Sequence, residues 1–370
     1  MEFRDRLLQL SLIEGVGAIT IKKLLHALTV DELCNLDQLT THQLAQKVEW
    51  PLEKSKALLT ALYSTESYDK EIDLAHKCGV RIVTLADVEY PAALKQIHAP
   101  PPILYLRGVW NSSLEKSIAL VGSRQVDAYG KAVIERFVPA LVQEGFGIVS
   151  GGAIGADTVA HEQTLQNSGS TLAVIGAGLL KPYPSSNQKL FEQIVAQGGA
   201  IMSPFALQVT AQPHNFPARN RIIAGISYGT IVVQAAQKSG ALITASYARE
   251  EGREVGAVPG TITNPLSAGC HSLLKEGATL IADEAELLLF AGVQGVSSGT
   301  QMVTLTKMSE ATQIKRPQDQ LVVLCAEPQE FDELLLTSGL DFMQLQQKLS
   351  QLQLEGVVTQ DISGRWHVAG

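Results

Sequence analysis

The sequence predicts an α/β fold with a Rossmann-like, doubly wound and mostly parallel sheet. Six short apolar runs between residues 117 and 260 are rich in β-branched side chains and lack alternation of polar and apolar positions. Strands of this kind are buried on both faces, which is typical of parallel sheets covered by helices. Helical stretches such as residues 129–145 separate the runs. This alternation of strands and helices indicates a doubly wound sheet.

Residues 1–70 predict a small helical domain that precedes the sheet. Within this leucine-rich region, residues 12–25 fit two short amphipathic helices joined by Gly15-Val16-Gly17. This is the pattern of a helix-hairpin-helix or SAM-like domain, whose tight glycine turn can offer backbone N–H groups to a phosphate. A plain helical corner explains the same residues equally well, so both interpretations stay open.

Residues 71–290 are expected to form the sheet domain, beginning with two short strands joined by a proline-rich crossing within residues 79–108. Residues 291–318 shift to Gly, Ser, Thr and Gln without apolar periodicity, which indicates a linker. Residues 319–370 then predict three helical segments and a hairpin, the order of a winged-helix domain. Its helix at residues 341–355 has little positive charge, which favours a protein-interaction role over reading a DNA duplex.

Composition narrows the class of protein. Of 370 residues, 45% are hydrophobic and 18% are charged, the balance of a globular chain. The 29 Lys and Arg against 37 Asp and Glu give a net charge of −8, so binding of a polyanion requires a local basic concavity. The four cysteines include no C-x-x-C pair, so neither a zinc site nor a disulfide framework is expected. We see no signal peptide and no uncharged apolar segment of membrane-spanning length, so a cytoplasmic protein without membrane attachment is expected.

The segment F-P-A-R-N-R, residues 216–221, is the strongest pointer to function. It opens an apolar helix with an aromatic ring and two arginines, Arg219 and Arg221. A helix N-terminus already directs free N–H groups and a positive dipole toward a ligand. Arginines there can clamp an anion that carries a flat base, on which Phe216 can stack. Salt bridges within the fold are the alternative explanation of the two arginines.

Several predicted strands end in glycine together with Ser, Arg or Lys. In an open parallel sheet, ligands bind beyond the carboxyl ends of the strands, near the change in strand order. Glycines there let backbone amides approach anionic oxygens, and arginines can pair with phosphates through two hydrogen bonds. A tight turn explains any one of these ends, but it does not explain several together. The predicted binding residues are Gly122, Ser123, Arg124, Ser150, Gly151, Gly152, Gly155, Lys181, Phe216, Arg219, Asn220, Arg221, Ser239, Gly240 and Thr244.

Enzymatic interpretations of the same loops fit less well. The sequence has neither a G-x-G-x-x-G series with a later acidic residue nor a Walker loop. Asp157 and His161, four apart on a predicted helix, could form an acid–base pair, but a helix-stabilising contact is the favoured interpretation. No nucleophile, base and orienting group stand out together, and no metal-ligand spacing is present. The sequence therefore predicts binding without catalysis, cofactor or metal.

The chain resembles the bacterial DNA processing protein A (DprA/Smf) family along nearly its whole length. The matching motifs, in order between residues 90 and 260, are Y-P-A-A-L-K, P-P-I-L-Y, V-G-S-R, S-G-G-A-I-G-A-D, A-H, G-A-G followed by Y-P-S-S-N, F-P-A-R-N-R-I-I-A-G-I-S, S-G-A-L-I-T-A, G-R-E-V and A-V-P-G. A chance match to so many segments in one order is not credible.

By this resemblance, the chain is expected to bind single-stranded DNA without catalytic turnover. It would protect incoming DNA during natural transformation and load the recombinase RecA onto it. Family members work as homodimers through the Rossmann-like domain, so a homodimer is expected here. Carried over to this sequence, the resemblance implies a pocket lined by Gly122, Ser123 and Arg124, the Ser150–Gly155 loop, and Phe216, Arg219, Asn220 and Arg221.

The chain also departs from the family pattern. Pro204 stands after Ser203 where Ser-Glu is common, Gln234 stands where V-E-A is common, and Cys270-His271 replace an asparagine-containing turn. The loss of two carboxylates does not harm anion binding and argues against hydrolysis. The alternative function is a nucleotide phosphoribohydrolase-like enzyme on a similar fold, although the motif P-G-G-x-G-T-x-x-E of that group is missing. Release of free base from nucleoside monophosphates would identify such an enzyme.

Overall fold

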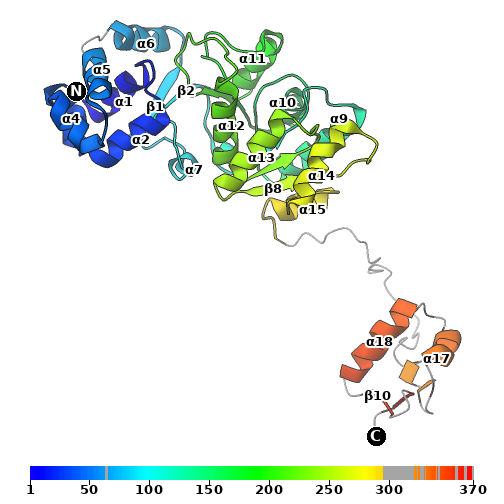
Figure 1. The fold of residues 1–370 in the computed structure, drawn as a ribbon. Coiled ribbons are helices and arrows are strands. Elements are labelled where there is room, and N and C mark those ends of the chain that lie inside the picture. The colour runs from blue at the N-terminus through cyan, green and yellow to red at the C-terminus, as the bar shows by residue number, and fades with distance from the viewer. Residues whose placement is uncertain are drawn as a thin grey trace. The chain divides into compact units, whose positions relative to one another are not determined.

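The computed structural model describes residues 1–62 and 66–294 and, further on, 321–322, 324–325, 329, 331–338, 340, 342–354, 357–361 and 365–368. The chain divides into two compact units, Met1–Thr300 and Gln301–Gly370, and each is described by itself (Figure 1). Most of the predicted linker, residues 295–318, lies outside the described residues. The domain boundary predicted at residue 70 falls inside the first unit and stays a prediction.

The amino-terminal part of the first unit is helical. Its elements are α1 (Phe3–Ser11), α2 (Ala18–Ala27), α3 (Val30–Cys34), η1 (Leu36–Gln38), α4 (Thr41–Val48), α5 (Leu52–Leu62) and α6 (Glu66–Lys77). Thr29 and Thr40 begin α3 and α4 with capping boxes, in which side chain and backbone satisfy each other's hydrogen bonds. The leucines of these helices pack in one hydrophobic cluster that also includes Tyr105 and Phe191 from the sheet region. The helical part and the sheet therefore share a core.

The sheet has nine strands in the order β1-β2-β6-β5-β4-β3-β7-β8-β9. The strands are β1 (Arg81–Thr84), β2 (Ile103–Gly108), β3 (Ser117–Val121), β4 (Gly147–Ser150), β5 (Thr171–Val174), β6 (Ala200–Ser203), β7 (Gly229–Val232), β8 (Glu254–Ala257) and β9 (Thr279–Leu280). The seven strands from β3 to β9 are parallel, which confirms the predicted mostly parallel sheet. β1 and β2 add two antiparallel strands at one edge, a feature that the sequence did not predict.

β3 is the point from which the chain winds in two directions. From β3 the chain adds β4, β5 and β6 on one side, and β7, β8 and β9 on the other. All five residues of β3 are buried. Ile118 and Leu120 belong to one hydrophobic cluster, while Ala119 and Val121 belong to another, as expected for neighbouring residues of a strand. The strand is thus covered on both faces, as its unbroken apolar run predicts.

Helices cover the two faces of the sheet. Residues from α9 (Ala128–Gln143), α10 (Ala156–Gln166) and α15 (Glu284–Phe290) pack in one cluster, and those from α12 (Asn215–Ile226), α13 (Gly240–Glu250) and α14 (Ala268–Lys275) pack in the other. α12 lies beside α13, as Figure 1 shows. The remaining elements are α7 (Ala92–Lys95), α8 (Ser112–Glu115), η2 (Ser185–Asn187), α11 (Gln188–Ala196) and η3 (Pro265–Ser267).

The second unit has its own small core. Its described elements are α17 (Phe331–Ser338), α18 (Phe342–Leu354) and an antiparallel pair, β10 (Val358–Gln360) and β11 (Trp366–Val368). Leu334, Leu345, Leu349 and Trp366 are buried together. Two helices followed by a hairpin agree with the order predicted for the end of a winged helix, and the winged-helix assignment itself stays a prediction.

Two features are absent from the described residues. None of the helices described there has both the length and the apolar character that a bilayer crossing requires. The same residues contain no group of three or more His, Cys, Asp or Glu placed to hold a metal ion.

Close packing of loops at the carboxyl edge of the sheet generates a first prediction. A Cβ at Gly178 would collide with the backbone carbonyl oxygens of Ala206 and Leu207, whereas a Cβ at Gly240 would meet no atom within 4 Å. We expect Gly178→Ala to lower the free energy of unfolding by about 1–3 kcal/mol, because backbone must move. Gly240→Ala, the matched control, should change it by less than about 0.5 kcal/mol. Urea denaturation of both variants measures this, and equal stability of the two would contradict it.

Candidate functional site

A cavity of about 490 Å³ opens at the carboxyl edge of the sheet. It lies where β3 meets β7, the position at which the order of strands reverses and at which ligands bind in open α/β sheets. The loop after β3, the loop after β4 and the first turns of α12 and α13 line it. Nine of the fifteen predicted residues line this cavity: Gly122, Ser123, Arg124, Phe216, Arg219, Asn220, Ser239, Gly240 and Thr244.

A smaller cavity of about 30 Å³ shares Arg124, Phe216 and Arg219 with the larger one. It adds the predicted residue Gly151 and the ring of Tyr183. The two cavities together bring residues from the loops after β3, β4 and β5 to one place. The clustering at the strand ends that the sequence indicates is therefore present in the structure.

Phe216 is the centre of the cluster. The guanidinium carbons of Arg124 and Arg219 lie 5.7 and 5.8 Å from the centroid of its ring. The ring of Tyr183 lies 5.9 Å away, tilted by 59°. A Cβ at Gly176 would lie 3.0 Å from the Phe216 ring, so this glycine gives the ring its place. Two cations and one further aromatic ring thus lie close to Phe216, which lines both cavities.

Arg219 is more deeply buried than an arginine that only binds an anion at the surface would be. Its side chain is 5% exposed. Its Nη1 donates to the carbonyl oxygens of Gly151 and Val174, the latter at 2.5 Å. Its Nε donates to Oδ1 of Asn220 at 3.0 Å. Burial lowers the pKa of Arg219 to about 10, and Arg124 adds to this while Asp157 opposes it. Arg219 therefore stays charged at neutral pH and is held rigidly.

Asp157 is a buried carboxyl group close to Arg219. A Cβ at Gly151 would lie 2.7 Å from both the Arg219 guanidinium and the Asp157 carboxyl group. Both groups therefore pack closely against this glycine. Burial raises the pKa of Asp157, and the Arg219 charge acts against this. The carboxylate also accepts the backbone N–H of Ala153 at 3.2 Å. Asp157 thus interacts electrostatically with Arg219 and fixes the loop after β4.

Arg124 is the exposed cation of the site. It projects from the loop after β3, and among the described residues no carboxylate lies within ion-pair distance of it. The loop packs closely on Gly155, where a Cβ would meet the carbonyl oxygens of Ser123 and Arg124. Gly155 also has a φ of +91°, which favours glycine. Within the loop, Ser123 Oγ accepts the N–H of Gln125 at 3.0 Å. Arg124 is thus a free cation on an anchored loop.

Five predicted residues lie outside both cavities: Ser150, Gly152, Gly155, Lys181 and Arg221. Ser150 is fully buried, and its hydroxyl donates to the Leu120 carbonyl at 2.6 Å. Gly152 and Gly155 shape the loop after β4 through close packing, and Lys181 is exposed to solvent.

Arg221 faces away from Arg219. Its guanidinium carbon lies 4.7 Å from the centroid of the Tyr247 ring, and Nε lies 3.9 Å from the Glu251 carboxylate. The expectation that both arginines clamp one anion is not met, because residues two apart project from opposite sides of a helix. For Arg221 the structure shows the alternative, a salt bridge within the fold.

His161 is buried behind the site. Its Nδ1 lies 2.7 Å from the hydroxyl of Thr171, which itself donates to the Ile148 carbonyl, so Nδ1 is the donor. Burial lowers the pKa of His161 to about 3, and the Arg219 charge acts in the same direction. The imidazole is therefore neutral at physiological pH and has no exposed surface through which to exchange a proton with a ligand.

Sequence reasoning missed several residues of the cavity wall. Tyr183, Gln125 and Ile243 line the two cavities and were not predicted as binding residues. Tyr183 is 48% exposed and belongs to the Y-P-S-S-N segment that follows β5, which was a usable signal. Nothing in the local sequence marks Gln125 or Ile243, because their position at the cavity depends on the tertiary fold.

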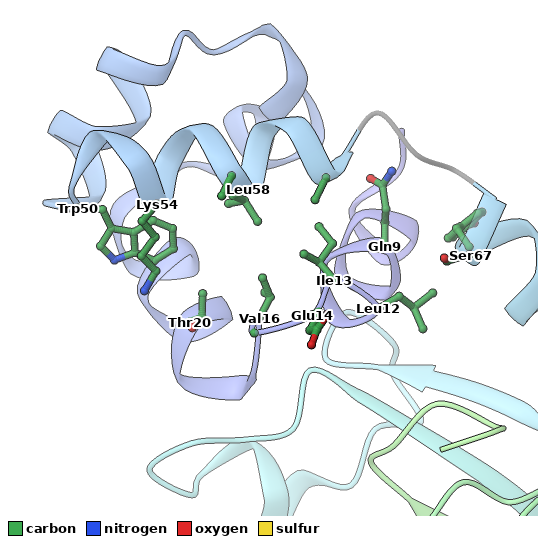
Figure 2. Close-up of a pocket in the computed structure, with 14 residues that line it drawn as sticks. Gln9, Leu12, Ile13, Glu14, Val16, Thr20, Trp50, Lys54, Leu58 and Ser67 are labelled. Carbon is green, nitrogen blue, oxygen red and sulfur yellow. The ribbon is translucent and has the colours of Figure 1, made fainter. Parts of the chain in front are cut away.

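A second large cavity, of about 410 Å³, lies among the amino-terminal helices (Figure 2). Apolar side chains such as Leu12 contribute most of its lining, together with Gly15 of the predicted phosphate-binding turn. Lys54 lies beside Trp50 at one end, with Nζ 4.3 Å from the ring centroid (Figure 2). The exposed acid Glu14 stands in the turn itself. This cavity does not gather cations, so binding of phosphate at the turn stays a prediction.

Comparison with known proteins agrees with the motif analysis. Residues 81–292 match the family model described as DNA recombination-mediator protein A. The chain belongs to this family. It is 34% identical to the Smf protein of Synechocystis over 317 residues, which cover 77% of this chain and 79% of the relative. It is also 34% identical to the DNA processing protein DprA of Bacillus subtilis over 269 residues, covering 67% and 90% of the two chains.

Solved structures of family members share the fold. The crystal structure of DprA from Streptococcus pneumoniae is similar with a TM-score of 0.65 at 33% identity, covering 78% of this chain and 97% of that one. DNA processing protein A from Helicobacter pylori, whose structure is described for its single-stranded DNA binding mode, is similar with a TM-score of 0.50 at 29% identity. The match covers 56% of this chain and 94% of the Helicobacter pylori chain.

The buried charges of the site yield a second prediction. We expect Asp157→Asn to lower the free energy of unfolding by about 1–3 kcal/mol, because Arg219 loses its electrostatic interaction with the carboxyl group in a desolvated setting. Glu162→Gln on the same helix is the matched control, since Glu162 is exposed, and should be nearly neutral. Urea denaturation at pH 7 compares the variants. An Asp157→Asn variant as stable as the control would show that the carboxyl group does not stabilise the arginine.

Proposed function

We propose that this chain binds single-stranded DNA in the cavity at the carboxyl edge of the sheet, protects incoming DNA and loads RecA onto it during natural transformation and recombination. It does so as a cytoplasmic homodimer and without a catalytic step. One observation supports this most: the guanidinium carbons of Arg124 and Arg219 lie 5.7 and 5.8 Å from the centroid of the Phe216 ring, at the change in strand order. Membership of the DNA recombination-mediator protein A family, and the single-stranded DNA binding mode described for the Helicobacter pylori protein, point the same way.

The arrangement suits a single strand better than a duplex. A nucleobase must leave its stack to reach a ring inside a cavity of about 490 Å³, and the bases of a single strand are free to do so. Stacking on an aromatic ring is tolerant of sequence, because every base has a flat face. The exposed Arg124 can then bind a neighbouring phosphate, while the buried Arg219 adds positive potential from within the cavity wall.

The remaining parts of the chain have proposed roles of their own. Residues 1–70 form a helix-hairpin-helix or SAM-like domain in this proposal, and residues 319–370, beyond a linker at 291–318, form a winged helix that contacts a protein partner. The low positive charge of the described helix α18, with Lys348 as its one basic residue, supports a partner role over duplex reading.

Arg124 provides the third prediction. We expect Arg124→Ala to weaken binding of a labelled oligothymidylate about tenfold or more, because charge-assisted hydrogen bonds contribute roughly 1.5–3 kcal/mol each. The plot of log affinity against log salt should become shallower by about 0.7, the value for one phosphate contact on a single strand. Arg249→Ala, which removes an exposed arginine paired with Glu276, is the matched control and should leave both quantities unchanged. An unaltered slope in Arg124→Ala would contradict the proposed pocket.

Phe216 provides the fourth prediction, and it separates stacking from charge. Phe216→Leu should reduce affinity for the same oligonucleotide by roughly 5- to 100-fold, because stacking on an aromatic side chain contributes about 1–3 kcal/mol per base. The salt dependence should stay that of the wild type, since no phosphate contact is lost. Fluorescence anisotropy at several salt concentrations measures both quantities. Wild-type affinity in Phe216→Leu would show that no base stacks on this ring.

RecA loading is the fifth prediction. A long single strand coated with a single-strand-binding protein delays RecA assembly, and we expect the wild-type chain to shorten that delay in a RecA ATP-hydrolysis assay. The Arg124→Ala variant should not do so at concentrations where it fails to bind the strand. A wild-type chain that binds the strand but leaves the delay unchanged would retain the binding proposal and exclude the loading role.

A further inference from the structure

The loop that carries Arg124 contacts one residue, Gln234, at both of its ends. The loop leaves β3 at Gly122, where a Cβ would lie 3.2 Å from the backbone carbonyl oxygen of Gln234. It ends at Asp127, the residue that caps the start of α9. Gln234 follows β7 and is 1% exposed. Both ends of a six-residue loop therefore meet a buried residue of the neighbouring strand end.

The side chain of Gln234 makes two hydrogen bonds to Asp127. Its Nε2 donates to Asp127 Oδ1 at 2.9 Å, and its Oε1 accepts the backbone N–H of Asp127 at 3.2 Å. A Cβ at Gly130 would collide with this Oε1, so the amide lies directly against the first turn of α9. The amide group of glutamine has one donor and one acceptor end, and both are used.

The Asp127 carboxylate completes the network. It accepts the N–H of Gly130 at 3.0 Å and the Nδ2 of Asn264, from the loop after β8, at 2.8 Å. The hydrogen bonds from Gly130, Asn264 and Gln234 hold the pKa of Asp127 below its ordinary value, so it is ionised at neutral pH. The ionised carboxylate thus joins the loops after β3, β7 and β8.

We propose that Gln234 is a positioning residue for single-strand binding, whose amide holds the loop of residues 122–127 so that Arg124 lies over the cavity. This rests on the proposed function. Gln234 itself does not line either cavity of the site, so it acts through Asp127 and the loop.

In this chain the role requires an uncharged amide at position 234, where the family commonly has glutamate, because the side chain there lies against the ionised Asp127. A glutamate there would place a second carboxylate beside the ionised Asp127, and like charges at such a distance repel and raise the pKa of one of the pair. When pH falls through that raised pKa, one carboxyl gains a proton that it can donate to the other. A glutamate variant is therefore expected to lose the loop position at neutral pH and to regain it in mild acid.

The other titratable groups around Gln234 do not produce this pattern. Burial raises the pKa of Tyr129, whose hydroxyl donates to the Pro259 carbonyl at 2.6 Å, and burial raises the pKa of Cys270 to about 11, so both stay uncharged. His271, whose Nε2 lies 2.9 Å from the Gly260 carbonyl, is common to all variants. The wild-type pH profile therefore serves as the reference for His271 and for Asp157.

The test is oligothymidylate binding by the full-length chain at pH 7.5 and pH 5.5, over a range of salt. At pH 7.5 we expect Gln234→Glu to bind about tenfold more weakly than the wild type, with a salt slope shallower by about 0.7, as if Arg124 were lost. At pH 5.5 its affinity should return to within about twofold of the wild type, with the wild-type slope. Gln234→Leu, which removes the amide without adding charge, should be weaker at both pH values alike.

Two further variants control for charge and folding. Gln193→Glu introduces the same charge at an exposed position of α11 and should match the wild type at both pH values. If thermal melting shows Gln234→Glu to be unfolded, Asn264→Ala decides, because it removes one bond to Asp127; about threefold weaker binding with a shallower salt slope is expected.

Wild-type binding by Gln234→Glu at pH 7.5, or no recovery at pH 5.5 in a folded variant, overturns the positioning role while leaving the proposed function standing. Wild-type binding by Asn264→Ala would overturn it where the first variant does not fold. A wild-type chain that fails to bind the oligonucleotide overturns the proposed function and this inference together.

Discussion

The buried guanidinium of Arg219 is the interaction on which the site depends. Its bonds to the carbonyl oxygens of Gly151 and Val174 fasten the start of α12 to the ends of β4 and β5. A buried cation is costly unless hydrogen bonds compensate it, and here carbonyl groups do so, with the Asp157 carboxyl group close by. Because α12 is fixed in this way, Phe216 in its first turn has a fixed place in the cavity wall.

The two arginines of the site have different roles: Arg219 stabilises the structure, and Arg124 is proposed to bind the ligand. Arg219 is almost fully buried and donates its hydrogen bonds to the protein, whereas Arg124 is exposed and is the one proposed to bind a ligand. In the proposed function, this division allows a chain with a net charge of −8 to offer a phosphate a favourable position. In this proposal the positive potential arises locally, from one buried and one exposed cation near the Phe216 ring, and a basic surface over the whole molecule is not needed.

The sequence predicted the parallel strands because burial on both faces leaves a local pattern: unbroken apolar runs such as residues 117–121. It did not predict that β1 and β2 run antiparallel, since strand direction depends on partners distant in the chain. At the site, glycine and arginine at strand ends located the cavity. They did not distinguish Arg219, which bonds to Gly151, from Arg221, which pairs with Glu251, because that difference lies in which helix face meets which neighbour.

The glycines at the strand ends also prove to have a more specific role than exposing amides to an anion. Side chains at Gly155 and Gly178 would meet backbone carbonyl oxygens of neighbouring loops, and one at Gly122 would meet Ala156 and then the backbone of Gln234. These loops are therefore packed against one another, and their geometry is fixed before a ligand arrives. A rigid cavity loses little conformational entropy on binding, so the ordering cost falls on the ligand. In the proposed function, a flexible single strand loses conformational entropy as each nucleotide becomes ordered. The stacking of each base and the pairing of each phosphate would offset that loss.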